Sequence, residues 1–280
     1  MAVNVPVVDF HFHVTTGDEY TDWLLNWLGG HGGKELLDHL SQVLSSPEAM
    51  LRYLDDQGID FAVALAETTP SITGISPNER VADFCLASER LIPFANINPY
   101  VIADLAGELR HCVSDLGCRG LKLYPTYQHF YANDSRLYPL YAEAQRLAVP
   151  VMVHTGSSVF RGARLKYGDP LYLDDVTADF PELTIVMAHS GRGFWYDAAF
   201  FLTQLHRNVY MEITGLPPRR LLTYFPNLEK NADKVIFGSD WPALTDIKGN
   251  IAAIRSLPLS EETKANILGG TAARLLGLAR

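Results

Sequence analysis

The chain alternates short apolar, β-branched runs with longer stretches in which apolar residues recur at helical spacing. Near-continuous apolar runs of about four to eight residues are typical of strands covered on both faces, as in a parallel sheet. Eight such runs predict strands at residues 6–13, 59–66, 91–98, 119–124, 150–155, 183–189, 208–214 and 234–239. The connections are long enough for crossover helices, so the pattern favours a parallel α/β fold.

Three connecting stretches carry clear helix signals. Ser46 and Pro47 mark the start of one helix, whose first turn is acidic, and Gly58 marks its end. Residues 137–147 repeat apolar positions at helical spacing. Residues 261–276 do the same, with Ser260 as the expected N-cap. We therefore expect helices to separate the strands.

Eight strand–helix units in 280 residues predict a (β/α)8 barrel, read as one domain over residues 1–280. The alternative is an open, doubly wound sheet, but no glycine-rich phosphate fingerprint follows the first strand. Two long connections, 14–46 and 157–175, follow the first and fifth strands. We expect both to lie as long loops at the mouth of the barrel, where loops carry function.

Composition narrows the class of protein and its partners. Hydrophobic residues make up 48% of the chain and charged residues 20%, as in an ordinary globular protein with a sizeable core. The net charge of −9 argues against binding to nucleic acid or to an anionic membrane. There is no membrane-length apolar run or secretory signal pattern, and the three cysteines are not spaced as metal ligands. We expect a cytoplasmic protein with a small-molecule partner, and a homodimer by default.

Polar residues stand at the ends of several predicted strands. His11 and His13 are two apart on the first strand and therefore leave it on the same face. His154, His189 and Asp240 end the fifth, sixth and eighth strands. Strands one and eight are neighbours in a barrel and strand five lies opposite, so these groups can meet on the axis. Imidazole and carboxylate ligands predict one divalent ion at His11, His13, His154 and Asp240, with zinc expected first and manganese as the other choice.

Four polar positions keep more than one interpretation. His189 is a fifth ligand, a general base or an electrophile towards a substrate oxygen. Lys122, in the fourth strand, holds a substrate carboxylate, bridges two metals as a carbamate, or forms an internal ion pair. Glu67 and Glu212 are candidates for contacts that support the ligands, and purely structural roles are the alternative.

The loops after the strands indicate an anionic, flat substrate. Cations fall in the predicted mouth at Arg161, Arg164, Lys166, Arg192, Arg219 and Arg220. Tyr124 and Trp241 lie just past strand ends, where they can wall a cyclic substrate. We expect substrate contacts from Lys122, Tyr124, Arg161, Arg164 and Trp241. The alternatives are solvated charges and aromatic packing.

The motifs VVDFHFH, GCRGLKLYP, VPVMVHTG, DFPELTIVMAHSG and VIFGSDWP occur in this order along nearly the whole chain. In these motifs the chain resembles the amidohydrolase superfamily, in the amidohydrolase-2 branch of metal-dependent hydrolases and decarboxylases with a TIM-barrel fold. The resemblance implies that His11, His13, His154 and Asp240 bind one divalent ion. It also implies that His189 is catalytic and that Lys122 does not bridge metals.

Hydrolysis is the first hypothesis for the reaction. A metal-activated water would attack a small, carboxylated lactone, other cyclic ester or amide, with Asp240 taking the water's proton and His189 stabilising the oxyanion. The second hypothesis is non-oxidative decarboxylation of an aromatic or unsaturated acid at the same metal, with His189 or Asp240 protonating the carbon. The chain length of 280 residues resembles the small lactone-hydrolysing members and favours the first hypothesis. A barrel that only binds a ligand is a third, disfavoured by the complete ligand set.

Overall fold

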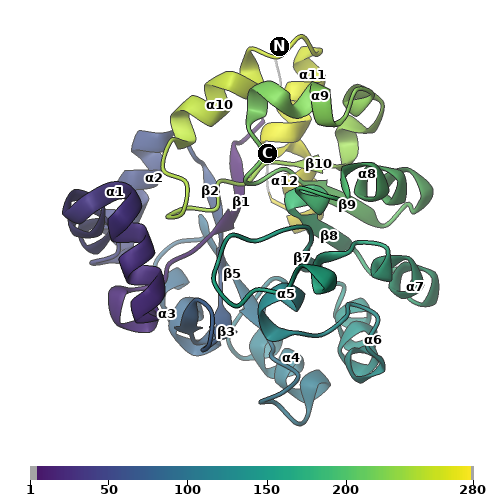
Figure 1. Cartoon of the computed structure of the whole chain (residues 1–280), viewed down its shortest axis with the longest axis horizontal. Coiled ribbons are helices and arrows are strands. Elements are labelled where there is room, and N and C mark those ends of the chain that lie inside the picture. Colours follow the sequence, from purple (N-terminus) through teal and green to yellow (C-terminus); the bar gives the residue numbers. More distant parts are fainter. Residues whose placement is uncertain (1–4, 279–280) are drawn as a thin grey trace.

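Eight parallel strands form a ring at the centre of the protein, and helices surround it (Figure 1). The computed structural model describes residues 5–278; the first four and last two residues of the predicted 1–280 domain lie outside the described part. The ring consists of β1 (Val8–Phe12), β2 (Phe61–Leu65), β5 (Leu91–Asn96), β6 (Leu121–Leu123), β7 (Val151–His154), β8 (Ile185–Ala188), β9 (Val209–Glu212) and β10 (Val235–Ile236). Each lies within one of the eight predicted runs, so the predicted (β/α)8 barrel is confirmed.

The first strand meets the end of the last one, which closes the ring. The backbone N–H of Phe10 donates to the carbonyl of Phe237 at 3.0 Å. Further along, Asp240 N–H donates to His11 O and His13 N–H donates to Trp241 O, both at 2.9 Å. The sheet therefore has no free edge here, and the alternative of an open, doubly wound sheet is wrong.

The strands bury both faces, as their apolar runs predict. One cluster fills the barrel interior and includes Val8, Phe10, Val63, Leu65, Phe94, Met152 and Val186. The opposite faces of the strands belong to the larger core shared with the helices. In β6, Leu121 and Leu123 face that outer core, so Lys122 between them points into the barrel.

One extra residue in β1 changes the direction in which the side chains at the end of the strand point. Val8 and Asp9 pair with Phe61 and Ala62 of β2, but the next paired positions are Phe12 and Ala64. Such a bulge commonly stands beside an active site. Phe10 packs inside the barrel against Phe94, whereas Phe12 stacks outside on Trp241. His11 and His13 both remain directed towards the barrel mouth.

Helices cover the outside of the ring and fill its connections (Figure 1). They are α1 (Asp22–Val43), α2 (Pro47–Gln57), α3 (Asn78–Cys85), α4 (Leu105–Ser114), α5 (Pro125–Gln128), α6 (Tyr138–Leu147), α7 (Tyr172–Asp179), α8 (Tyr196–Leu205), α9 (Leu221–Tyr224), α10 (Ile247–Arg255), α11 (Glu261–Ala265) and α12 (Thr271–Leu276). The Ser46 and Ser260 side chains accept from Ala49 N and Thr263 N at 3.2 Å, so both expected N-caps are confirmed. Gly58 ends α2 with φ = 74°.

The two long loops lie as expected, after the first and fifth strands of the ring. The first contains α1, whose helical backbone breaks at Gly33, where φ is 68°. A hairpin absent from the sequence prediction, β3 (Glu67–Thr69) with β4 (Gly74–Ser76), anchors the start of this loop. Thr21, the N-cap of α1, donates its backbone N–H to Thr73 O at 2.9 Å.

Across residues 5–278, every helix is too short or too polar to cross a membrane. The expected homodimer and cytoplasmic location stay predictions.

The predicted helix over 261–276 is interrupted by a wider turn at Asn266–Gly270, and Gly269 gives the physical reason. Its α-carbon lies so close to the chain entering β1 that an added methyl would overlap the carbonyl oxygen of Pro6. This turn seats α12 under the barrel, where Ala272 and Leu276 join the interior cluster.

We expect Gly269→Ala to destabilise the fold by about 1–3 kcal/mol, because backbone at Pro6 must shift to admit the methyl group. Gly30→Ala is the matched control, since its methyl would meet open space within α1 and should be neutral or stabilise by about 0.5–1 kcal/mol. Urea unfolding followed by circular dichroism measures both. Equal midpoints for the two variants would contradict the proposed close approach.

Candidate active site

His11, His13 and Asp240 converge at the mouth of the barrel. The Nε2 atoms of His11 and His13 lie 3.3 Å and 3.5 Å from the same oxygen, Oδ1 of Asp240. Two imidazole nitrogens and a carboxylate oxygen therefore surround one point, in an arrangement that could hold a metal ion. The backbone bonds between β1 and the segment after β10 produce this convergence.

His154 and His189 complete the ring of polar groups predicted from the sequence. The His189 ring lies 4.6 Å from that of His154 and 5.0 Å from that of His11, centroid to centroid. All five residues line one narrow cavity of about 40 Å³, room for a few water molecules. Nε2 of His154 is buried and has no hydrogen-bond partner among the described residues. An unpaired, buried imidazole nitrogen beside two others fits a site that binds a metal.

Hydrogen bonds at the other ring nitrogen fix two of the imidazoles. Nδ1 of His11 lies 3.4 Å from Oε2 of Glu212, and Nδ1 of His189 lies 3.1 Å from the carbonyl oxygen of Thr214. A carboxylate and a carbonyl can only accept, so each Nδ1 carries the proton. The Nε2 atoms of both rings are then left with free lone pairs.

The backbone at the site adopts conformations that L-residues rarely take. Asp240 has φ = 63°, and His189 and Ser190 have φ = 63° and 47°. Positive φ in such residues costs free energy and persists where the surroundings over-determine it. The bond from Asp240 N to His11 O and the bond from Ser190 Oγ to Glu212 O, at 2.8 Å, supply that support.

Burial governs the protonation of the cluster. It lowers the pKa of His11, His154 and His189 well below the ordinary value, which keeps these rings neutral, the form that binds metals. It also lowers the pKa of Lys122 to about 8 and raises that of Glu212 to about 8. For Asp240, burial acts to raise the pKa, but the hydrogen bond and charge of His13 outweigh it and the pKa falls.

The residues expected to contact substrate are only partly brought to the cavity. Tyr124 lines it, and its hydroxyl donates to Ala66 O at 3.1 Å. Lys122 is fully buried in the barrel interior and does not line the cavity. Trp241 packs outside the barrel between Phe12 and Tyr53 of α2. The ring centroids of Trp241 and Phe12 lie 4.6 Å apart. The bulge in β1 turns Phe12 outwards, and Trp241 lies outside the barrel because it stacks on Phe12.

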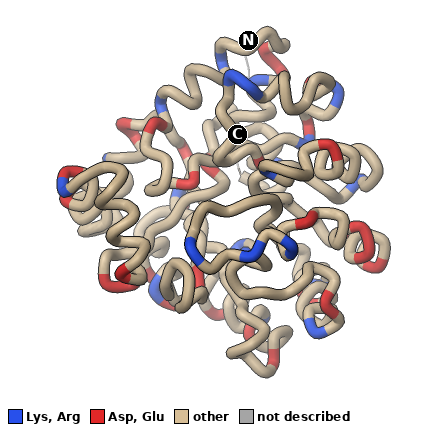
Figure 2. The backbone as a smooth tube through the Cα atoms, viewed as in Figure 1, with Lys and Arg blue, Asp and Glu red and all other residues tan. Residues whose placement is uncertain are grey.

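The predicted cations of the loop between β7 and α7 lie on its outer surface. Arg161 and Arg164 are exposed and do not line the cavity. Figure 2 places blue positions along this loop, where it crosses the barrel mouth. Their predicted contact with substrate gains no support from this arrangement, because the loop turns apolar Phe160 inwards in their place.

Sequence reasoning missed most of the apolar wall of the cavity. Leu24 and Leu28 of α1 line it, together with Tyr20, Thr73, Phe160, Pro242 and Ala243. Tyr127, just past the fourth predicted strand, lines it as well, as its position allows. Trp23 and Trp27 pack against Phe160, with ring centroids 6.1 Å and 5.3 Å away. The Trp and Leu residues recur at helical spacing in the loop expected at the mouth, but the spacing alone did not show which of them face the cavity.

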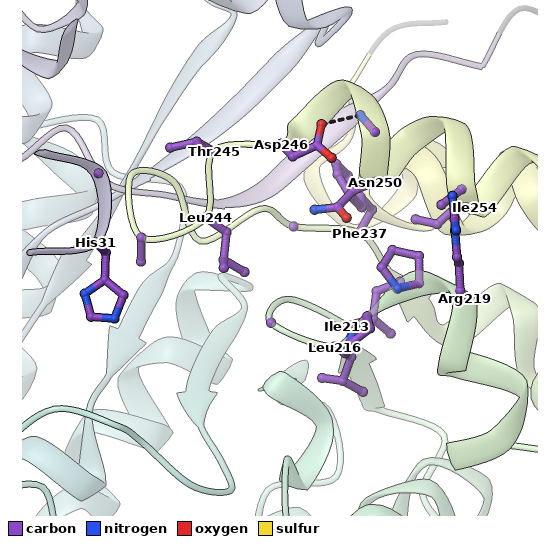
Figure 3. A pocket seen from close by; sticks show the side chains of 18 of the residues that line it. His31, Ile213, Leu216, Arg219, Phe237, Leu244, Thr245, Asp246, Asn250 and Ile254 are labelled. Carbon is purple, nitrogen blue, oxygen red and sulfur yellow. Dashed lines mark hydrogen bonds between the residues drawn. The ribbon is translucent and has the colours of Figure 1, made fainter. Parts of the chain in front are cut away.

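A larger groove of about 990 Å³ lies beside the cavity (Figure 3). Its walls come from the second half of α1, the segment after β9 and the start of α10, and include His31, Leu216, Arg219, Leu244 and Asn250. Ala243 lines both the groove and the cavity. The two hollows therefore adjoin each other at this residue.

Comparison with known proteins shows which family the chain belongs to. The family model described as Amidohydrolase matches residues 8–278. A γ-resorcylate decarboxylase of Rhodococcus jostii is 25% identical over 264 positions, which cover 72% of this chain and 79% of the relative. A TIM-barrel protein of Bordetella bronchiseptica superposes with a TM-score of 0.79 at 23% identity, over 97% of this chain and 98% of the other.

A third comparison bears on the chemistry of the fold's relatives. The dihydroxybenzoic acid decarboxylase of Polaromonas, solved with manganese and 2-nitroresorcinol, superposes with a TM-score of 0.67 at 18% identity. The match covers 98% of each chain. This likeness shows that the two proteins share the barrel fold.

These matches correct the first hypothesis for the reaction. Hydrolysis of a lactone or amide is wrong as the main interpretation, because the curated relatives are decarboxylases. Chain length, on which the preference for hydrolysis rested, does not identify the reaction. The donor set also left the reaction open, because one metal site serves either chemistry.

Asp9 is the residue whose loss should loosen the site without removing any of its polar groups. Its Oδ1 accepts the backbone N–H of His11 at 3.1 Å and of Ser239 at 2.9 Å, and the residue is fully buried. We expect Asp9→Ala to lower the free energy of unfolding by about 2–4 kcal/mol, because it leaves two buried donors unpaired. Asp9→Asn keeps the accepting oxygen and should lower the free energy of unfolding much less. Urea unfolding tests this; a loss for Asp9→Asn as large as for Asp9→Ala would refute the role of the oxygen.

Proposed function

The chain belongs to the amidohydrolase family, and from that premise we propose that it is a metal-dependent decarboxylase of a hydroxylated aromatic carboxylic acid. The products are the corresponding phenol and carbon dioxide. The observation that carries the proposal is the convergence of His11, His13 and Asp240 in a chain whose relatives are decarboxylases. We assign the whole of residues 1–280 to this one enzyme domain.

The metal would be held by His11, His13, His154 and Asp240. The imidazole nitrogens of the first three and the carboxylate of the fourth suit manganese or zinc, and the manganese of a structural neighbour favours the former. When bound, the ion supplies a Lewis acid that holds the substrate's carboxylate and hydroxyl oxygens in place.

His189 orients the substrate. Its Nδ1 proton is committed to the carbonyl of Thr214 at 3.1 Å, so Nε2 can only accept. A hydroxyl beside the carboxylate of an aromatic acid is the matching donor. This argument favours hydroxybenzoates over acids without such a hydroxyl.

Asp240 carries the proton that replaces the carboxylate. Because its pKa is lowered, Asp240 is ionised at rest and must first take up a proton from water. The proton adds to the ring carbon; the bond to the carboxylate carbon then breaks, its electron pair returns to the ring, and carbon dioxide leaves. Asp240 suits this task because it lines the cavity and its side chain is 20% exposed, against 2% for His11. A path to water lets it recover a proton after each turnover.

The cavity walls match a flat, anionic ring. Tyr124 and Tyr127 stack 5.8 Å apart with an angle of 18° between their planes. Phe160 packs against Tyr127 with ring centroids 6.0 Å apart, and Leu24 and Leu28 also line the cavity. Lys122, buried in the barrel interior, adds a positive potential that favours a carboxylate. The groove that shares Ala243 with the cavity offers further room for the substrate.

Metal-loaded protein is expected to release carbon dioxide from a hydroxybenzoate such as 2,6-dihydroxybenzoate. Treatment with a chelator should abolish the release, and manganese or zinc should restore it. Carbon dioxide and the phenol are measured together over a panel of benzoates with and without an adjacent hydroxyl. No release from any of them by protein shown to contain metal would sink the proposal.

Asp240→Asn should lower the rate of carbon dioxide release by about 100- to 10,000-fold, since it removes the proton donor. The metal content of the variant must be measured in parallel, because Asp240 is also a proposed ligand. Asp197→Asn, at an exposed position in the first turn of α8, is the control and should keep the wild-type rate. A metal-loaded Asp240→Asn protein with normal turnover would contradict the assignment.

A further inference from the structure

We infer that Glu212 is the positioning residue of the metal site and that Lys122 is its counter-charge inside the barrel. Glu212 fixes the ring of His11 so that Nε2 faces the proposed ion. Lys122 offsets the cost of keeping that carboxylate in the interior. The inference rests on the proposed function, since it concerns the metal site that the function requires.

Every hydrogen bond to the Glu212 carboxylate comes from an N–H donor. Oε1 accepts from Thr214 N at 2.7 Å, and Oε2 accepts from His189 N at 3.1 Å and from Nδ1 of His11 at 3.4 Å. Backbone N–H donors at both oxygens favour the ionised, acceptor-only carboxylate. Glu212 therefore connects His11, His189 and Thr214 at one point.

The carboxylate has no room to rotate away from His11. Glu212 is fully buried at the end of β9, and Ser190 Oγ donates to its backbone oxygen at 2.8 Å. A methyl group on Gly238 would lie within 2.5 Å of Oε1 and 2.7 Å of the β-carbon of His11. Because Gly238 closes over both side chains, the contact between Glu212 and His11 is held from the side as well.

Lys122 explains how an ionised carboxylate is tolerated there. Lys122 is fully buried, and its Nζ has no hydrogen-bond partner among the described residues. Its strand neighbours are leucines of the outer core, so an apolar residue would suit the position if packing alone mattered. A buried charge without compensation is costly. Among the charged groups that act on Lys122, Glu212 is the strongest, followed by Asp240 and Glu67.

The other carboxylate near the histidine pair holds its ring less firmly. Oε2 of Glu67 lies 3.8 Å from Nδ1 of His13, beyond a normal hydrogen bond. Its Oε1 accepts instead from the hydroxyls of Thr69, at 2.8 Å, and of Thr73. The two tandem histidines are thus supported unequally, and we assign the positioning role to Glu212 alone.

The test compares Glu212→Gln with Glu143→Gln. Glu143 is a second buried carboxylate paired with arginines, but it lies on α6, outside the site. A glutamine at 212 offers one acceptor and one donor, so it cannot satisfy the three N–H groups around it. Titration of the metal-free proteins with Mn²⁺, followed by electron paramagnetic resonance, should give an affinity about 10- to 100-fold weaker for Glu212→Gln. Glu143→Gln should bind Mn²⁺ as the wild type does. Equal affinities for wild type and Glu212→Gln would overturn the inference.

A second measurement needs no bound metal. Histidine ¹⁵N chemical shifts of the metal-free protein report which ring nitrogen carries the proton. In the wild type His11 should be protonated at Nδ1, and Glu212→Gln should reduce that form. Unchanged His11 shifts would overturn the positioning role, even if the protein failed to bind metal or to release carbon dioxide. A wild-type protein that binds Mn²⁺ but releases no carbon dioxide would remove the proposed function and leave this inference standing.

The counter-charge is tested by stability. Lys122→Met leaves Glu212 uncompensated and should lower the thermal midpoint, whereas Lys122→Met combined with Glu212→Gln removes both charges and should recover part of the loss. The double variant also serves if Glu212→Gln alone fails to fold. A double variant less stable than Lys122→Met would refute the role of Lys122.

Discussion

The backbone hydrogen bonds that join β1 to the segment after β10 hold the candidate active site together. They close the barrel, and in the same three bonds they set Asp240 beside His11 and His13. A metal site needs its donors within a few ångströms, and these three come from opposite ends of the chain. The first strand must therefore meet the last in this register for the convergence of donors to exist.

This closure also concentrates groups that are costly to bury. Asp9, Lys122 and Glu212 lie in the barrel with almost no exposed surface, and Asp240 takes a left-handed backbone conformation. Hydrogen bonds offset part of this cost at the two interior carboxylates. Asp9 accepts two backbone N–H groups, for example, and Glu212 accepts three donors. Backbone strain and buried charged groups thus occur together at the candidate site, as they commonly do at functional sites.

The chemistry of the site is less determined than its geometry. Three imidazoles and a carboxylate serve hydrolysis and decarboxylation alike, so the ligand set left the reaction open and chain length led to the wrong first hypothesis. What distinguishes the reactions is what covers the metal site. Leu24, Leu28, Phe160 and two tyrosines line the cavity, and the groove shares Ala243 with it. Such an apolar lining beside Asp240 suits the proposed protonation of a ring carbon better than attack by water.

The sequence by itself determined the barrel and the five polar strand ends. Strand and helix periodicity are local properties, and the carboxyl ends of parallel strands necessarily share one face, so His11, His13, His154, His189 and Asp240 could be placed from the pattern. Only the tertiary structure decided where loop side chains point. The bulge in β1 sends Phe12 outwards and takes Trp241 with it, and the loop after β7 buries Phe160 while leaving Arg161 and Arg164 exposed. The bond between Glu212 and His11 joins residues 201 positions apart. Contacts of this kind depend on packing between distant segments, which no local pattern of residues encodes.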